Sequence, residues 1–140
     1  MIPNLHNVTP DFWRGGRVGS SNDWEQLYID GCRRVLVLNG DSDAYARALG
    51  LEVIQCPITD DEAQSALRDP TVLDRIDAII DARRPLFVHC TEGMDRTGIA
   101  VARYRVRQCG WTKADAFAEW VKFGSHGYKG LVDNWNAWTP

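Results

Sequence analysis

Short apolar segments that alternate with helical patterns constrain the fold of this chain most strongly. Each segment is bordered on at least one side by glycine, asparagine or proline, as is typical of buried strands. The predicted strands are Phe12–Arg14, Val35–Leu38, Glu52–Cys56 and Leu86–His89. Strands that alternate with helices over short connections favour an α/β fold, in which helices flank a central, largely parallel sheet.

Apolar residues at helical spacing, together with capping residues, predict the helices. The first predicted helix is Asn22–Ile29, with Ser21 or Asn22 as its cap. A longer helix has Pro70 in its first turn and ends before Pro85. The other predicted helices are Asp43–Leu49, Thr97–Gln108 and Thr112–Phe123. No repeat or flexible linker divides the 140 residues. Because domains commonly have about 100–150 residues, we expect residues 1–140 to form one domain.

The balance of charges and the cysteine content exclude several classes of protein. The chain has 16 basic and 19 acidic residues, so it lacks the positive field with which proteins hold nucleic acid or anionic membranes. No segment approaches the ~18 uninterrupted apolar residues of a membrane span. The four cysteines are Cys32, Cys56, Cys90 and Cys109, a spacing too irregular for a zinc ribbon or a disulfide framework. We therefore expect a cytoplasmic protein with free thiols, with no metal, cofactor, nucleic acid or stable membrane insertion. The sequence carries no signal for the oligomeric state.

The segment after the strand Leu86–His89 carries the candidate chemistry. It reads Cys-Thr-Glu-Gly-Met-Asp-Arg over residues 90–96, and Thr97-Gly98 opens a helix. A strand–loop–helix turn directs backbone N–H groups into a concavity at a helix N-terminus, which binds anions. The guanidinium of Arg96 adds a planar fork of donors that suits two phosphate oxygens. The predicted phosphate-binding residues are Thr91, Glu92, Gly93, Met94, Asp95 and Arg96.

Cys90 lies at the start of this loop. N–H groups at a helix N-terminus and a nearby guanidinium stabilise a cysteine thiolate, which is the nucleophilic form. The thiolate is expected in line behind a bound phosphate, and that arrangement suits covalent phosphoryl transfer to sulfur. The hydroxyl of Thr97 could donate to the sulfur when the phosphocysteine is hydrolysed.

The pattern His89-Cys90-x-x-Gly93-x-x-Arg96-Thr97-Gly98 resembles the signature of the cysteine-dependent protein tyrosine phosphatase superfamily, in particular its compact dual-specificity branch. Segments 13–17, 31–38 and 110–119 resemble parts of the same phosphatases in the same order. The resemblance implies an enzyme that hydrolyses phosphotyrosine, phosphoserine or phosphothreonine through a phosphocysteine. Its substrate would be a phosphorylated protein or a small phosphorylated molecule. It also implies that His89 hydrogen-bonds the loop and helps to hold the thiolate.

The resemblance further implies an aspartate on a separate loop as the general acid. Asp60 is the candidate, and Asp61 is the alternative by one residue of register. Both aspartates also fit the first turn of a helix with a capping box at Thr59 and Glu62. Asp95 is a third candidate acid, although it could instead turn outward as a helix cap or bind Arg14 or Arg17.

The substrate class stays open at this point. Phosphoinositide phosphatases of the tumour-suppressor type carry loop lysines at the positions of Thr91 and Met94, and this chain lacks them. An inositol phosphate or phosphoinositide phosphatase of the same fold remains the alternative, and a non-catalytic phosphate-binding module is a further one. Cys56 could form a disulfide with Cys90, as a second cysteine does in some relatives, but the role of a plain strand residue is favoured.

Overall fold

The computed structural model describes all residues, 1–140, and contains a five-stranded sheet with the order β1-β2-β5-β3-β4. The strands are β1 His6–Thr9, β2 Phe12–Gly15, β3 Arg34–Val37, β4 Glu52–Gln55 and β5 Leu86–His89. Strands β2, β5, β3 and β4 run parallel to one another, and β1 pairs antiparallel with β2. The expected α/β fold with a largely parallel sheet is therefore confirmed.

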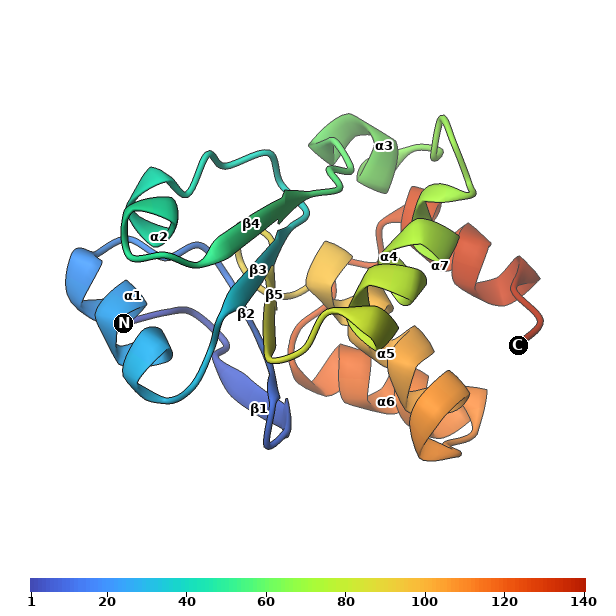
Figure 1. The fold of residues 1–140 in the computed structure, drawn as a ribbon. Coiled ribbons are helices and arrows are strands. Elements are labelled where there is room, and N and C mark those ends of the chain that lie inside the picture. Colours follow the sequence, from blue (N-terminus) through green and yellow to red (C-terminus); the bar gives the residue numbers. More distant parts are fainter.

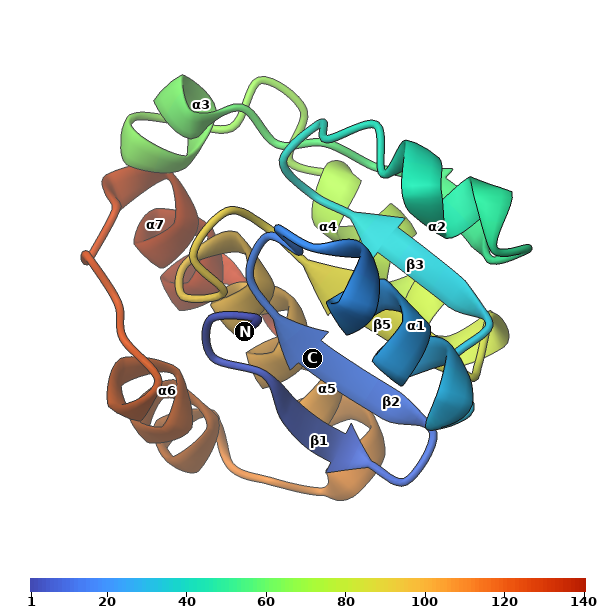
Figure 2. The ribbon, with the colours of Figure 1, turned by 90° about the vertical axis from the view of Figure 1, so that its left-hand side faces the viewer.

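The chain contains seven helices, six of which cover the two faces of the sheet. The helices are α1 Ser21–Ile29, α2 Ala44–Ala48, α3 Asp60–Gln64, α4 Val72–Ala82, α5 Arg96–Cys109, α6 Lys113–Lys122 and α7 Lys129–Ala137. Helices α1 and α2 lie on one side of the sheet, whereas α4, α5, α6 and α7 lie on the other (Figure 1; Figure 2 shows the face with α1 in front).

Two apolar cores follow from this layering, because successive strand side chains point to opposite faces of a sheet. On β3, Val35 and Val37 join the smaller core beneath α1, which also contains Trp24. Leu36, between them, joins the larger core with residues of α4, α5 and α6. The apolar strand pattern thus reflects burial on both faces, as the sequence predicted.

Several predicted boundaries are wrong by one or two residues. Helix α1 begins at Ser21 and is capped by Ser20, whose hydroxyl accepts a hydrogen bond from the N–H of Asp23. Pro70 precedes α4, which begins at Val72. Strand β1 and helix α7 were not predicted. The strand is a mostly exposed edge, and the helix begins without a side-chain cap, so neither has a strong local signal.

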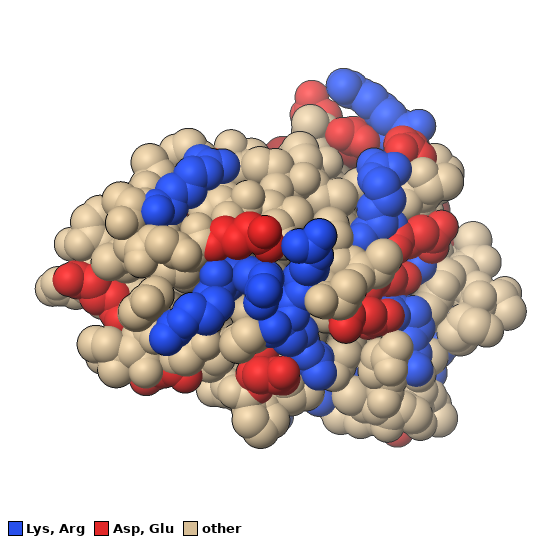
Figure 3. Space-filling model, in the orientation of Figure 1, with Lys and Arg blue, Asp and Glu red and all other residues tan.

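The surface charges are interleaved, as the near-balanced composition suggests. Figure 3 shows basic side chains next to acidic ones on the face that carries β4 and α4. Glu52 lies between Arg34 and Arg83, at 3.4 Å from each guanidinium. No helix combines the length and the hydropathy that crossing a bilayer requires.

Candidate active site

The predicted phosphate-binding segment, residues 90–96, lies between β5 and α5 at the carboxyl edge of the parallel strands, and is called the phosphate loop below. Gly93 has a φ of +75°. A Cβ at this position would lie 2.6 Å from the carbonyl carbon of Gly15, so the loop can pack against the end of β2 only with glycine here. The N–H of Arg17 donates to the carbonyl of Thr91 over 2.8 Å. Contacts with the end of β2 therefore shape the loop.

The sulfur of Cys90 lies at the floor of the loop, where the residue is 2% exposed. The hydroxyl of Thr97 lies 3.1 Å from this sulfur and 3.2 Å from the carbonyl oxygen of Gly15. The structure thus brings these two predicted residues together. Cys56 is a separate free thiol, as are the remaining cysteines.

The guanidinium of Arg96 is held in place from two sides. It donates to the carbonyl of Ile58 over 2.8 Å and to the hydroxyl of Thr91 over 3.4 Å. Arg96 is only 9% exposed. Because Ile58 directly precedes the segment with the candidate acids, the same side chain connects the phosphate loop to that segment.

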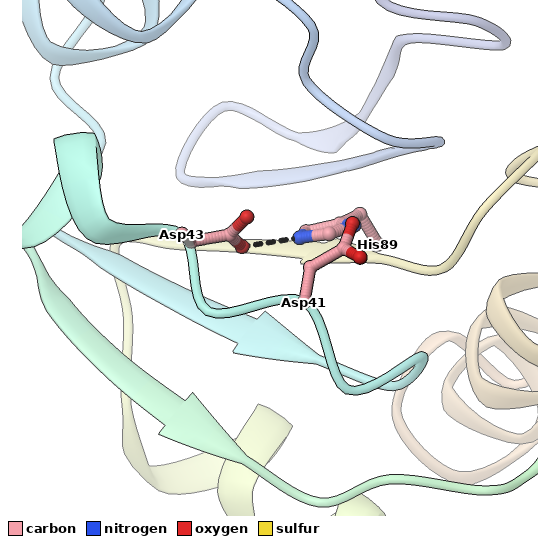
Figure 4. Close-up of side chains that lie close together, drawn as sticks. All are labelled: Asp41, Asp43 and His89. Carbon is pink, nitrogen blue, oxygen red and sulfur yellow. Dashed lines mark hydrogen bonds and ion pairs between the residues drawn. The ribbon is translucent and has the colours of Figure 1, made fainter.

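His89 is fully buried below the loop. Its Nδ1 lies 2.9 Å from the carbonyl oxygen of Cys90, and its Nε2 lies 2.6 Å from the carboxylate of Asp43 (Figure 4). The ring therefore bridges the Asp43 carboxylate and the backbone of the loop. The contact with the loop is the one that the resemblance implied, and Asp43 is an orienting partner that sequence reasoning missed.

Asp41 lies beside this pair (Figure 4), and its carboxylate belongs to a second network that supports the loop. Arg17 binds it through two hydrogen bonds of 2.8 Å, and these hydrogen bonds lower the pKa of Asp41. Asn39 donates both to Asp41 and to the hydroxyl of Thr91. The oxygens of Asp41 and Asp43 are thus used in hydrogen bonds that position the loop.

A cavity of about 500 Å³ opens above Cys90. Its lining residues are Asn39, Thr59, Asp60, Cys90, Thr91, Glu92, Asp95, Arg96 and Tyr128. Arg96 is the only cationic side chain in this lining, whereas Asp60, Glu92 and Asp95 are acidic. Of the predicted phosphate-binding residues, Gly93 and Met94 do not line the cavity. Gly93 faces β2, and Met94 packs beside Gly124.

Asp60 reaches the cavity and Asp61 does not. Both belong to the first turn of α3, which has the predicted capping box between Thr59 and Glu62. The carboxylate of Asp60 accepts a hydrogen bond of 2.7 Å from the amide of Gln64. The capping role and a position at the cavity therefore coexist in the same short helix.

Asp95 makes neither of the contacts predicted for it from the sequence, a helix cap or an ion pair with Arg14 or Arg17. It makes no side-chain cap for α5, and Arg14 and Arg17 bind other groups. Its two oxygens instead accept from His126, one from the backbone N–H over 2.8 Å and one from Nδ1 over 2.5 Å. Sequence reasoning missed His126 because it lies 31 residues away, in the connection between α6 and α7.

Arg14 supports the loop from below, and the residue is only 1% exposed. It donates to the carbonyl of Gly93 over 2.8 Å, and its guanidinium lies 4.6 Å from the centroid of the Phe123 ring. Burial lowers the pKa of Arg14 to about 10. The guanidinium therefore stays charged at neutral pH and places positive charge beneath the phosphate loop.

A largely parallel sheet whose central strand leads through Cys-x-x-Gly-x-x-Arg into a helix defines a cysteine-dependent phosphatase of the compact dual-specificity type. Comparison with known families agrees. Residues 14–110 match the family Tc-R-P, described as "Polymorphic toxin system, DSP-PTPase phosphatase", and the chain belongs to this family. It is therefore a phosphatase that hydrolyses phosphomonoesters through a phosphocysteine.

Solved structures share this fold. TpbA from P. aeruginosa is 23% identical, with a TM-score of 0.80 over 98% of this chain and 86% of its own. The catalytic domain of Siw14 from S. cerevisiae is 17% identical, with a TM-score of 0.80 over 99% of this chain and 88% of its own. Tk-PTP is 19% identical, with a TM-score of 0.72 over 97% of this chain and 96% of its own. No curated protein sequence matches the chain.

Proposed function

We propose that residues 1–140 form one catalytic domain in which Cys90 is the nucleophile, Arg96 and the loop hold the phosphate, and Asp60 is the general acid. In the first step the Cys90 thiolate attacks phosphorus. The S–P bond forms, the bond from phosphorus to the ester oxygen breaks, and Asp60 protonates the leaving oxygen. In the second step water attacks phosphorus, Asp60 accepts a proton from this water, and the P–S bond breaks to release inorganic phosphate.

One observation carries the proposal. The cavity is lined by the buried thiol of Cys90, the anchored guanidinium of Arg96 and the carboxylate of Asp60. Behind the cavity, the hydroxyl of Thr97 lies 3.1 Å from the Cys90 sulfur. The hydroxyl of Thr97 is placed to stabilise the thiolate that leaves in the second step. His89 and Asp43 act behind the loop, where they hold the carbonyl of Cys90.

We further propose a substrate with one phosphomonoester, of the phosphotyrosine, phosphoserine or phosphothreonine type, on a protein or a small molecule. Each phosphate group brings about two negative charges at neutral pH. The cavity lining offers one cationic side chain against three acidic ones, so a second phosphate would meet repulsion. The ring of Tyr128 in the lining provides a wall for an aromatic group. Among structures of this fold, TpbA has been solved with phosphotyrosine, whereas Siw14 is described as a PP-IP phosphatase.

A substrate panel under reducing conditions tests this choice. Phosphotyrosine and phosphoserine peptides, p-nitrophenyl phosphate and soluble inositol phosphates are compared by release of inorganic phosphate. We expect higher kcat/KM for the monophosphates. Higher values for the inositol polyphosphates would contradict the substrate assignment but not the mechanism. Cys90→Ser should abolish turnover, whereas Cys109→Ser, at an exposed cysteine, is the control that should not.

Labelling with iodoacetamide tests the nucleophile directly. Burial raises the pKa of Cys32 to about 11 and also raises the pKa of Cys56, so both thiols stay protonated at neutral pH. In a Cys109→Ser background, we expect Cys90 to be alkylated first and inorganic phosphate to protect it. Equal labelling of all thiols, with no protection, would contradict a phosphate site at Cys90. We also propose a cytoplasmic location, because a reducing compartment keeps cysteines such as these four as free thiols.

Paired substitutions test the general acid. Asp60→Asn should lower kcat by about 10²–10⁴-fold, the usual contribution of a positioned acid, and should remove the alkaline limb of the kcat profile. Asp61→Asn is the matched control, since Asp61 shares the helix turn but not the cavity. If the control shows the loss instead, the assignment is wrong by one residue.

A further inference from the structure

The connection between α6 and α7 packs directly against the phosphate loop. Gly124, the first residue after Phe123, lies so close to Met94 that a Cβ there would be 2.9 Å from the Met94 sulfur. Two residues further on, His126 binds both oxygens of Asp95. The ring of His126 then stacks on the ring of Tyr128, with centroids 5.0 Å apart and planes inclined by 13°.

The start of α7, which follows this connection, packs on the helix that carries the proposed acid. Gly130, in the first turn of α7, packs on α3 so closely that a Cβ would lie 2.1 Å from the carbonyl oxygen of Glu62. Residues 124–130 therefore contact the phosphate loop at one end and the helix of Asp60 at the other. Tyr128, between these two contacts, lines the cavity.

The charge of Asp95 requires compensation at this position. Its side chain is 9% exposed and belongs to the lining of the cavity, so a free carboxylate here would oppose both the thiolate and a phosphate dianion. No arginine or lysine pairs with Asp95, and its side-chain partner is the His126 ring. A protonated ring makes the pair neutral, whereas a neutral ring leaves one negative charge next to the bound phosphate.

We propose that His126 is a positioning residue of this active site: its imidazolium neutralises the Asp95 carboxylate beside the phosphate, and its ring holds Tyr128 as a wall of the substrate cavity. This inference rests on the proposed phosphatase function and adds a residue outside the signature loop. His126 acts on phosphate binding through Asp95, and no contact between His126 and the substrate is required.

The charged and titratable groups around His126 set the sign of the pH effect. Asp95 and Glu92 face it from the phosphate loop, Asp60 faces it from α3, and Tyr128 stacks on it. The hydrogen bond with Asp95 raises the pKa of His126 above its ordinary value. Below this pKa the His126–Asp95 pair is neutral. As the pH rises through it the pair becomes negative, so KM for a phosphomonoester should rise.

Replacing His126 by asparagine separates charge from hydrogen bonding, since the asparagine amide can donate near the position of Nδ1 without a positive charge. For His126→Asn we expect KM for p-nitrophenyl phosphate, and the inhibition constant of inorganic phosphate, to rise about tenfold at about pH 6, which corresponds to about 1.4 kcal/mol. We expect kcat to change by no more than about threefold, because uniform binding is what is lost. The rise of KM with pH that His126 causes should disappear.

The double variant Asp95→Asn/His126→Asn is the decisive measurement. Removing the carboxylate makes the pair neutral again, so KM should return to within about twofold of the original value. Asp95→Asn alone should keep a low KM and shift the pH-dependent rise to lower pH. His6→Asn is the matched control, since His6 is exposed, stacks on Phe123 and does not line the cavity.

Two results would overturn the proposal. One is an unchanged KM in His126→Asn at acidic pH, and the other is a double variant whose KM exceeds that of His126→Asn alone. His126→Ala provides a second readout, since it removes the stacking on Tyr128 as well and should raise KM for the aryl phosphate further than the asparagine variant does. All these variants retain Cys90, so failure here leaves the phosphocysteine mechanism intact, whereas persistent turnover in Cys90→Ser would refute that mechanism.

Discussion

Replacing Thr97 by valine removes one hydroxyl and keeps the shape of a fully buried side chain. That hydroxyl lies 3.1 Å from the sulfur of Cys90. When the phosphocysteine is hydrolysed, the sulfur leaves as a thiolate, and the negative charge that develops on it strengthens this hydrogen bond. The second chemical step should therefore depend on Thr97 more strongly than the first.

The size of the effect follows from the geometry. A hydrogen bond to a charged group contributes about 1.5–3 kcal/mol. The single proton of Thr97 is shared between the sulfur and the carbonyl of Gly15, at 3.1 and 3.2 Å, so a value of about 2 kcal/mol is appropriate. At about 1.4 kcal/mol for each factor of ten, kcat for Thr97→Val should fall about thirtyfold.

Stopped-flow measurement with p-nitrophenyl phosphate distinguishes the two steps. Thr97→Val should release p-nitrophenol in a burst of about one equivalent per enzyme, followed by slow turnover, because the phosphocysteine accumulates. Thr97→Ser keeps the hydroxyl and loses only a methyl group, so its kcat should stay within about threefold of the original. An equal loss in both variants, or a slow Thr97→Val enzyme without a burst, would refute the role of the hydroxyl in the second step.

Two other substitutions test the support of the loop. Arg14→Met should lower kcat/KM about tenfold, because it removes both the hydrogen bond to the Gly93 carbonyl and a charge beneath the phosphate; an unchanged value in steady-state kinetics would show that Arg14 is only a packing residue. Gly98→Ala should destabilise the fold by about 1–3 kcal/mol in urea titration, as overpacking does, since its Cβ would lie 2.3 Å from the Trp120 ring. Gly19→Ala is the control, because a Cβ there meets nothing within 4 Å, and equal losses in both variants would argue against overpacking.

Features that depend on neighbouring residues could be predicted from the amino-acid sequence. The phosphate loop is one continuous segment from β5 through Arg96 into α5, so its residue types and spacing specify both the turn and its chemistry. The caps of α3 and α6 were predictable for the same reason, because Thr59 and Thr112 bind N–H groups three residues away. The alternation of strands and helices, and hence the fold class, also follows from local apolar patterns.

Features that depend on exposed or irregular segments were harder to predict. Strand β1 has one buried residue in four, so it lacks the apolar pattern that marks the central strands. Helix α7 begins without a cap and is held by the packing of Leu131 and Trp135 into the larger core. Such elements are stabilised by tertiary contacts, which a local pattern does not contain.

The remaining contacts of the site depend on tertiary packing and could not be predicted locally. Arg14 meets Gly93 across 79 residues, and His126 meets Asp95 across 31. The direction in which α3 faces makes Asp60, and not Asp61, part of the cavity lining. These contacts depend on how α3, α7 and the end of β2 pack around the loop. Hydrogen bonds and charge pairs form between whichever groups that packing brings within about 3 Å, regardless of their separation along the chain.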